Sequence, residues 1–402
     1  MKRPVFISVA TLATAFLLAA ATLLTPLQAQ IIATDLPAGK LEVVATFPGP
    51  MPTGVTVSRH NRIFVNFPRW GDTVPFTVAE VVHGQAVAYP SEEINDEQDP
   101  LNAAANAKHF ISVQSVVVDP ADHLWILDTG APLLGHTIPN GPKLVAIDLA
   151  TNQVVKTILF PIEIAGLNAY LNDVRFDLTV GTKDEHGIGG FAYITDSSSN
   201  GPNGIVVVDL ATGKSWRRLD NHPSTLPEPG FVIFAEGRPV YITDPVQPPT
   251  PAKFGSDGIA ISNDGSKIFY CPLSSTKLYS VSAAALRDQS QSEAQVIATV
   301  HLVTGKAPSD GLESDSDGNV YATDYNSNSI QKIAPNGMIE TIAHDPTLLW
   351  PDTLSLSDDG YLYVTANQLH RQPTFHNGKD QRQKPYVLYR VKLNAKPVRL
   401  IK

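Results

Sequence analysis

The residues of this sequence best suited to chemistry are three aspartates that open three similar segments. Asp257 begins "DGIAISNDGSKIFYC", Asp310 begins "DGLESDSDGNVYATD" and Asp352 begins "DTLSLSDDGYLYVTA". If these carboxylates converge, each pair about 6 Å apart repels by roughly 3 kcal/mol at an effective dielectric constant of about 20. Such a group must either hold a proton, which raises a pKa, or bind a cation.

Three further segments follow the same plan and place an amide or hydroxyl side chain at the equivalent position. They begin at Thr53 ("TGVTVSRHNRIFVN"), Gln114 ("QSVVVDPADHLWILD") and Asn172 ("NDVRFD"). Oxygen atoms of Asp and Asn are the hard ligands that calcium or magnesium prefers. The six positions therefore predict one polar centre, which binds either a divalent cation or a small polar ligand.

The elements that must position these residues are β-hairpins. Each segment is a short alternating strand, a turn that often contains Asp-Gly, and a second strand rich in Val, Ile, Tyr and Phe. Third and fourth strands follow most hairpins, as in "KLVAIDL" and "QVVKTILF". Six such units predict an all-β, six-bladed β-propeller whose first strands line a central channel. Two stacked β-sandwiches are the alternative, but they do not explain the recurring dipeptide pattern.

The two ends of the chain are expected to complete one blade together. The strand "LEVVATF" (41–47) has no hairpin of its own, whereas the last hairpin and "YVLYRVKL" (386–393) lack a fourth strand. Pairing them closes the ring and removes an exposed edge. One short helix is expected within 99–110, between the first two blades.

The N-terminus has the layout of a secretory signal peptide. Lys2 and Arg3 precede a long apolar stretch that ends in small residues near Ala29. We expect cleavage there, which leaves residues 30–402 as a single propeller domain, secreted or periplasmic and without integral membrane association; an uncleaved membrane anchor is the alternative. The single cysteine, Cys271, can form no internal disulfide, so stability must come from a large core.

Charge and motifs exclude several classes of function. The formal net charge is −9, which argues against nucleic acid and anionic membranes as partners. The sequence has no H-E-x-x-H, G-x-x-x-x-G-K or G-x-S-x-G pattern. We therefore expect no zinc centre, no nucleotide or organic cofactor and no serine-hydrolase elbow.

A few other residues are candidates for contact with a ligand. Asp173 follows Asn172 in a strand that should be apolar, His370 lies in a loop near the channel and is a candidate general base, and Trp350 precedes the sixth channel strand as a candidate lid. Trp70 and Trp125 are expected to pack inside blades, and Cys271 to act as a small buried hydrophobe.

Several motifs together resemble the major royal jelly protein and Yellow family, in its bacterial branch, often labelled dopachrome tautomerase-related. The resemblance runs from about residue 41 to the C-terminus and rests on "FVNFPRWGDTVPFT", "LWILDTGAP", "AYLNDVRFD", "AYITDSSSNGPNGIVVVDLATGKSWR", "YCPLSSTKLYSV", "SDGLESDSDGNVYATDYNSNSI" and "WPDTLSLSDDGYLYVTANQLHR". It implies a secreted six-bladed propeller that binds a small ligand or acts in melanin-precursor chemistry.

A more distant similarity is to gluconolactonase and regucalcin-like propellers. It implies a divalent metal, calcium or a similar ion, held by an acidic residue on the first blade and by Asn or Asp on the third, fourth and fifth. Carried over to this sequence, the last three would be Asn172, Asp257 and Asp310, while the first blade offers only Thr53. Asp352 is the candidate replacement ligand.

Three functions follow as hypotheses. The first is a binder or tautomerase-like enzyme for a small polar or aromatic ligand, with a cationic amine or an aminochrome favoured by the negative channel. The second is a metal-dependent lactonase or esterase, in which Asp257 or Asp310 takes a proton from water. The third is a non-catalytic scaffold that binds an unspecified protein partner at the propeller rim.

Overall fold

The computed structural model describes Met1, residues 39–244 and residues 246–402. Apart from Met1, the predicted signal peptide (1–29) and the predicted start of the domain at residue 30 lie outside this part of the chain. No helix among the described residues is long and apolar enough to cross a membrane.

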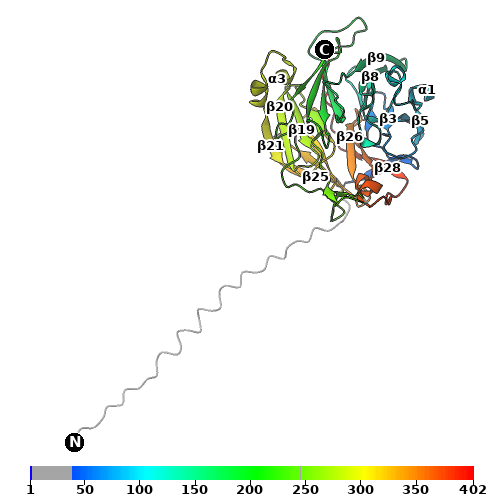
Figure 1. Cartoon of the computed structure of the whole chain (residues 1–402). Coiled ribbons are helices and arrows are strands. Elements are labelled where there is room, and N and C mark those ends of the chain that lie inside the picture. The colour runs from blue at the N-terminus through cyan, green and yellow to red at the C-terminus, as the bar shows by residue number, and fades with distance from the viewer. Residues whose placement is uncertain (2–38, 245) are drawn as a thin grey trace. The chain divides into compact units, whose positions relative to one another are not determined.

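In the described part of the chain, six four-stranded antiparallel sheets surround a common centre, as the propeller prediction requires (Figure 1). The first blade contains β2 (Val55–Val57), β3 (Ile63–Asn66), β4 (Val78–Val82) and β5 (Gln85–Ala88). The second contains β6 (Val113–Val118), β7 (His123–Asp128), β8 (Lys143–Asp148) and β9 (Gln153–Leu159). The third contains β10 (Leu171–Asp177), β11 (Phe191–Asp196), β12 (Gly204–Asp209) and β13 (Ser215–Arg218).

The fourth, fifth and sixth blades follow the same order from the centre outward. The fourth blade contains β18 (Ser256–Ile261), β19 (Lys267–Pro272), β20 (Lys277–Ser282) and β21 (His301–Gly305). The fifth contains β22 (Leu312–Ser314), β23 (Val320–Asp324), β24 (Ser329–Ile333) and β25 (Ile339–His344). The sixth contains β26 (Pro351–Leu356), β27 (Tyr361–Ala366), β28 (Tyr386–Lys392) and β1 (Leu41–Phe47).

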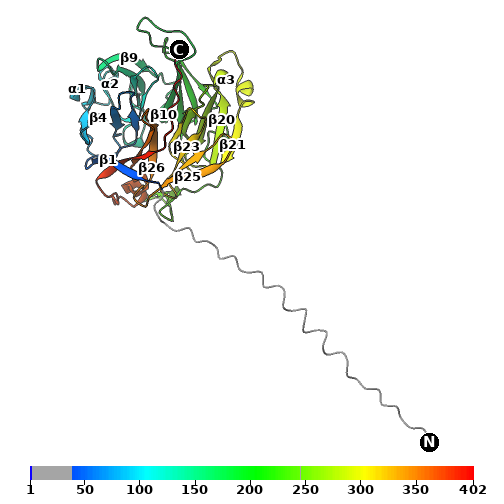
Figure 2. The same cartoon turned by 180° about the vertical axis from the view of Figure 1, so that it is seen from behind.

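The sixth blade takes its outermost strand from the start of the described chain. Strand β1 pairs antiparallel with β28, from Leu41 opposite Val391 to Phe47 opposite Tyr386. Figure 2 shows β1, in blue, beside the red C-terminal strand. Residues more than 300 positions apart in sequence thus share one sheet.

The hairpin turns explain the recurring Asp-Gly dipeptides. Gly265, Gly318 and Gly360 have φ values of 70°, 86° and 80°, in the left-handed region that glycine adopts without strain. Asn61 and Asp122, with φ values of 58° and 71°, occupy the same place in the first two blades. Asn and Asp are the other residues that tolerate this conformation, so the turns repeat in geometry even where the letters differ.

The hydrophobic core lies between neighbouring blades. Trp125 of β7, for example, is fully buried and stacks on Phe176 of β10, with ring centroids 5.3 Å apart. Similar clusters fill each of the other junctions between blades. Cys271 is buried in the cluster between the fourth and fifth blades, as a small apolar side chain. Each blade therefore depends on both of its neighbours.

Short elements connect the blades. The helices are α1 (Glu92–Asn95) and α2 (Ala103–Asn106), the latter within the predicted 99–110, with α3 (Ala283–Arg287) and α4 (Glu293–Ile297) in the fourth blade. An insertion after the third blade, here called the arch (residues 231–244 and 246–251), contains β14 (Phe234–Ala235), β15 (Arg238–Pro239), β16 (Tyr241–Ile242) and β17 (Thr250–Pro251). It contacts the loop between β27 and β28, here called the sixth-blade loop (residues 367–385).

Candidate functional site

A cavity of about 150 Å³ lies where the first strands of the blades begin. Five of the six positions predicted to face one another line it: Gln114, Asn172, Asp257, Asp310 and Asp352. The sixth, Thr53, is fully buried, and its hydroxyl donates to the backbone carbonyl of Gln114 instead. We call this space the channel cavity.

Irregular pairing of the first strands aims these side chains at the channel. The register of β6 with β7 shifts between Val113 and Ser115, and that of β10 with β11 shifts between Leu171 and Val174. Strands β18 and β26 shift in the same way around Asp257 and Asp352. A β-bulge bends a strand and re-aims a side chain, so each of these polar residues lies at a bulge.

The glycines that follow two of the aspartates allow the first strands to approach one another closely. A Cβ atom on Gly258 would lie 2.3 Å from the carbonyl oxygen of Asp310, and one on Gly311 would lie 2.2 Å from that of Asp352. Both distances are impossible for a real side chain. In each Asp-Gly pair at the channel, the aspartate lines the cavity and the glycine lets the next blade pack closely against it.

The three aspartates are buried together. Asp257, Asp310 and Asp352 are 4%, 5% and 5% exposed, and Asp310 lies within hydrogen-bonding reach of the other two. Burial raises the pKa of Asp310 to about 6, although a hydrogen bond from Trp350 opposes the shift. Burial and then the charge of Asp310 raise the pKa values of Asp257 and Asp352 well above their usual range.

The hydrogen-bond donors around this triad are neutral. Asn172 Nδ2 donates to Asp257 Oδ1 over 2.7 Å, Trp350 Nε1 to Asp310 Oδ2 over 2.7 Å, and Asn367 Nδ2 to Asp352 Oδ2 over 2.5 Å. No Lys or Arg of the described chain forms an ion pair with the three carboxyls. The triad thus has three acids and no basic partner, so protons or a bound cation must compensate its charge.

The residues of the metal site implied by the similarity to gluconolactonases are already engaged in hydrogen bonds. Asn172 presents its amide nitrogen, not its oxygen, to Asp257, and one oxygen each of Asp310 and Asp352 accepts a hydrogen bond from Trp350 and Asn367. Across the described residues, no group of three or more His, Cys, Asp or Glu side chains is arranged to hold a metal ion. This arrangement fits shared protons better than a divalent cation, and metal binding by Asn172, Asp257 and Asp310 stays a prediction.

Aromatic side chains form one wall of the cavity. The hydroxyl of Tyr170 accepts a hydrogen bond from Trp70 Nε1 over 2.9 Å and donates to Gln114 Oε1 over 2.9 Å. Phe254 and Phe375 line the cavity as well. Trp70 packs against the hydrophobic cluster at the junction of the sixth and first blades, in line with the packing prediction, and its half-buried side chain also lines the cavity.

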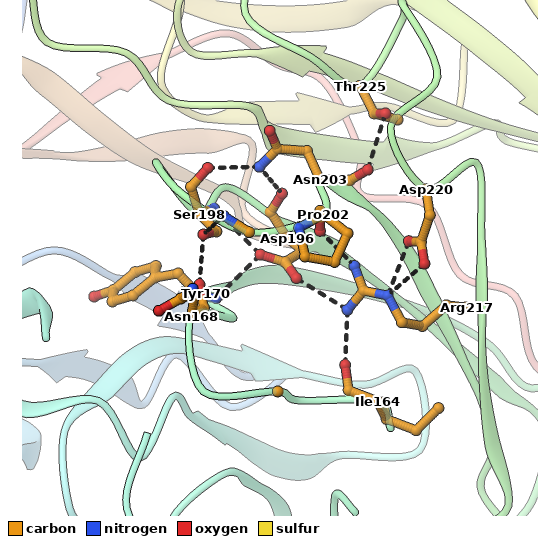
Figure 3. A network of polar contacts seen from close by, with 12 residues as sticks. Ile164, Asn168, Tyr170, Asp196, Ser198, Pro202, Asn203, Arg217, Asp220 and Thr225 are labelled. Atoms are coloured by element: carbon orange, nitrogen blue, oxygen red, sulfur yellow. Dashed lines mark hydrogen bonds and ion pairs between the residues drawn. The ribbon is translucent and has the colours of Figure 1, made fainter. Parts of the chain in front are cut away.

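A polar network at the end of β11 fixes the wall that carries Tyr170 (Figure 3). Asp196 accepts hydrogen bonds from the backbone nitrogens of Tyr170 (3.0 Å) and Ser198 (3.2 Å), and it pairs with Arg217 over 2.9 Å. Ser198 donates through its hydroxyl to the carbonyl of Asn168. Two cavity-lining loops are therefore tied to one buried carboxylate.

The remaining predicted residues lie behind the cavity surface. Asp173 is buried one position further along β10, near Arg175, and burial raises its pKa. Trp350 is 1% exposed and stacks between Tyr325, with ring centroids 4.4 Å apart, and His370, at 5.6 Å. Trp350 thus supports Asp310 from behind and does not cover the cavity. His370 pairs with Glu236 of the arch over 2.7 Å.

Sequence reasoning missed most of the cavity wall. Its members lie in loops that occur once in the chain: Leu134, Gly135, His136, Asn168, Ala169, Tyr170, the run Ser197–Asn200, Phe254, Leu273, Leu369 and Phe375. A repeat alignment cannot find a residue without an equivalent in other blades. The only available signal was the position of these loops, which connect strands on the side of the channel where the first strands begin.

Comparisons with known proteins agree with this architecture. Residues 111–400 match the family described as Major royal jelly protein. Protein yellow of Drosophila guanche is 27% identical over 244 residues, which cover 58% of this chain and 39% of that protein. The match thus spans well under half of the relative's length.

Two solved structures are similar in fold. Regucalcin from Agrobacterium tumefaciens, described as a calcium-binding protein, has a TM-score of 0.54 at 12% identity and covers 89% of this chain and 95% of its own. A presumed gluconolactonase has a TM-score of 0.52 at 10% identity and covers 90% and 94%. These likenesses concern the fold alone. The family match covers most of the chain, and the protein belongs to the major royal jelly protein family.

Proposed function

We propose that the protein binds a small primary amine with an aromatic or apolar body in the channel cavity. The observation that carries the proposal is the triad of Asp257, Asp310 and Asp352, which are buried in contact and have no basic partner among the described residues. An ammonium group supplies the missing positive charge and three hydrogen-bond donors. Trp70 and Tyr170 offer aromatic surface for the rest of the ligand.

The size of the cavity restricts the ligand. Its volume of about 150 Å³ lies below the roughly 300 Å³ at which drug-sized pockets begin. A single ring with a short aminoalkyl chain matches that space. Conversion of the ligand is the further part of the proposal, because a carboxyl with a pKa near 6, such as Asp310, suits general acid–base catalysis near neutral pH.

Calorimetry with tyramine and 4-ethylphenol tests the binding step. The two molecules share the phenol ring and differ by the amine, so we expect tyramine to bind at least about tenfold more tightly, equivalent to about 1.4 kcal/mol. Asp352→Asn should weaken tyramine binding, and Asp317→Asn, an exposed aspartate of the fifth blade, should not. Equal binding of the two phenols would contradict the proposal. Decay of dopachrome at the buffer rate would limit the function to binding.

A divalent cation is the second candidate for the same carboxyls. It is supported by three oxygen-bearing aspartates on successive blades and by the similar fold of a protein described as calcium-binding. Calcium titration of metal-free protein, beside the double variant Asp257→Ala with Asp310→Ala, separates the two candidates. Tight calcium binding that the double variant loses would replace the amine proposal and justify testing a lactone panel. Absence of binding would remove this candidate.

A further inference from the structure

A second cavity, here called the side cavity, lies between the arch and the sixth-blade loop. Its volume is about 290 Å³, close to the lower end of small-molecule pockets, at roughly 300 Å³. Pro239, Val240 and Phe375 form apolar parts of its lining, and Phe375 also lines the channel cavity. The two cavities are thus neighbours that share one side chain, and no step of the proposed function uses the side cavity.

The net charge that the side cavity presents to a ligand depends on which of its charged side chains are already paired with one another. Glu236 Oε1 accepts from Arg371 Nη2 over 2.5 Å, and Oε2 accepts from Arg371 Nε over 2.8 Å and from His370 Nε2 over 2.7 Å. Burial lowers the pKa of His370, which favours the neutral ring. Arg238 lines the same cavity, and its side chain has no ion pair or hydrogen bond with the described residues. The charge left for a ligand is therefore positive.

We propose that the side cavity binds a small monocarboxylate with an aromatic or aliphatic body. Guanidinium groups bind carboxylates through two parallel hydrogen bonds, and Arg238 stands beside the apolar surface of Pro239, Val240 and Phe375. A cationic ligand would meet Arg238 unfavourably. One unpaired guanidinium balances the single negative charge of a carboxylate, whereas a phosphate carries more negative charge than one guanidinium can balance.

The C-terminal carboxylate of the chain itself does not fill this cavity. Ile401 pairs with Leu178 at the end of β10, while the channel cavity lies at the start of the same strand, beside Asn172. Residues 400–402 therefore lie at the opposite end of the first strands from the two cavities.

A ligand in the side cavity would lie against groups that reach the triad. His370 lines the side cavity and stacks on Trp350, whose Nε1 donates to Asp310. His370 Nδ1 is buried without a hydrogen-bond partner in the described chain, so only the bond to Glu236 and the stack hold the ring. A ligand that displaces this ring changes the surroundings of Trp350, which gives a spectroscopic signal for binding.

Benzoate is the probe, with benzyl alcohol as its uncharged counterpart. Calorimetry on the mature wild-type protein, without any amine, should show saturable benzoate binding, accompanied by a change in tryptophan fluorescence. Benzyl alcohol should bind at least about tenfold more weakly. Trp350→Phe should abolish the fluorescence change while calorimetric binding persists. Equal binding of the two probes, or no saturable binding of benzoate, would overturn the proposal without any variant being needed.

Three charge variants locate the site. Arg238→Gln removes an exposed guanidinium and should weaken benzoate binding about tenfold. Lys267→Gln removes one positive charge from an exposed residue at the fourth-blade hairpin, and should leave the affinity for benzoate unchanged. Asp310→Asn should also leave it unchanged, since benzoate is not expected in the channel cavity. Benzoate affinity that follows Asp310 instead of Arg238 would place the ligand in the channel and overturn the assignment. Failure of tyramine to bind would not affect this result.

Discussion

Three carboxyls on successive blades share one buried space because the same position of the repeat carries an aspartate in each. The gain cannot be stability, since buried carboxyls without a basic partner destabilise the folded state when they are ionised. Neutral N–H groups of Asn172, Trp350 and Asn367 each donate a hydrogen bond to one oxygen of one of the three carboxyls. At the scale of the residue, the triad therefore costs stability whenever it is ionised, and the proposed ammonium ligand would offset that cost.

Asp310→Asn should make the stability of the protein less dependent on pH. Burial raises the pKa of Asp310 to about 6, whereas the unfolded chain releases this proton near 3.9. The folded state therefore loses stability as pH rises from about 4 to above 6, by up to about 3 kcal/mol for this group. An uncharged amide removes that loss. Midpoints of urea unfolding at pH 4.5, 6 and 7.5 measure the difference.

The slope of stability against pH should become shallower in Asp310→Asn and stay that of the wild type in Asp317→Asn. Asp257 and Asp352 also have raised pKa values, so part of the slope will remain. If both variants keep the slope of the wild type, Asp310 is ionised across this range and the triad holds its proton elsewhere.

The same proton couples ligand binding to pH. An ammonium ligand pairs with ionised carboxylates, so a protonated triad must release a proton when the amine binds. Tyramine affinity should rise between about pH 5 and pH 7, as Asp310 ionises, while the amine itself stays charged. Calorimetry in two buffers of different ionisation enthalpy measures the proton release directly. Affinity that is constant over this range would show that the triad is already ionised.

At the scale of the element, the arch and the sixth-blade loop form one cover beside the channel cavity. Thr243 donates through its backbone nitrogen and its hydroxyl to the carbonyl of Thr374, and Asn377 donates to the Thr243 hydroxyl. Glu236 pairs with both His370 and Arg371 across the same junction. The arch strands are two residues long and form no larger sheet. These polar contacts hold the arch together with the burial of Ile233, Ala235 and Val240 in the hydrophobic cluster at the junction of the sixth and first blades.

Glu236→Gln should loosen this cover without unfolding the propeller. The side-chain hydrogen bond from Arg371 lowers the pKa of Glu236 to about 2, so the pair persists throughout the neutral range and is lost only as pH falls towards 2. The side chain of Glu236 is about one-third exposed (35%), and ion pairs that solvent reaches contribute little to stability, so the global cost should stay at about 1 kcal/mol. Hydrogen exchange at the amides of Val240 and Thr243 should become about tenfold faster.

A matched change on the fifth blade provides the control. Glu340 pairs with Lys332 over 2.8 Å between β25 and β24, and Glu340→Gln should leave exchange in the arch at the wild-type rate. Equal exchange rates for Val240 and Thr243 in the wild type and in Glu236→Gln would show that the ion pairs of Glu236 do not hold the arch, and that the hydrogen bonds of Thr243 and the buried apolar side chains of the arch suffice.

The contrast between blades and arch shows what the sequence can predict. Hairpins repeat, so Asp257, Asp310 and Asp352 can be aligned and placed together from the repeat alone. The arch occurs once, and its strands are too short for a period-2 pattern to appear. The same limit applies to Tyr170 and Trp70, which line the channel cavity from loops that occur once in the chain. The bulges at Asn172 and Asp257 could not be predicted from the sequence either, because the register of each strand depends on the strand that pairs with it.

At the scale of the whole molecule, the ring is held by the pairing of β1 with β28. The other blades are each built from one continuous stretch of chain, whereas the sixth joins residues near both ends. Cores lie between blades, so an open ring would expose the apolar faces of the first and sixth blades. We therefore expect the pairing of β1 with β28 to contribute more to stability than another outer strand does, and a cross-link between them tests this.

Cysteines at Thr46 and Val387, which face each other across β1 and β28, should form a disulfide that stabilises the protein strongly. The bond closes a loop of roughly 340 residues, and chain entropy predicts about 6 kcal/mol for it, against about 2.5 kcal/mol for the loop of roughly eight residues between Lys332 and Glu340. The second pair, Lys332→Cys with Glu340→Cys, joins adjacent strands of one blade and is the control. The native Cys271 is buried and does not compete. Midpoints of unfolding, compared between oxidised and reduced forms of each variant, should shift more for the first pair. Equal shifts would mean that blades unfold independently and that the pairing of β1 with β28 contributes no more than an ordinary outer strand.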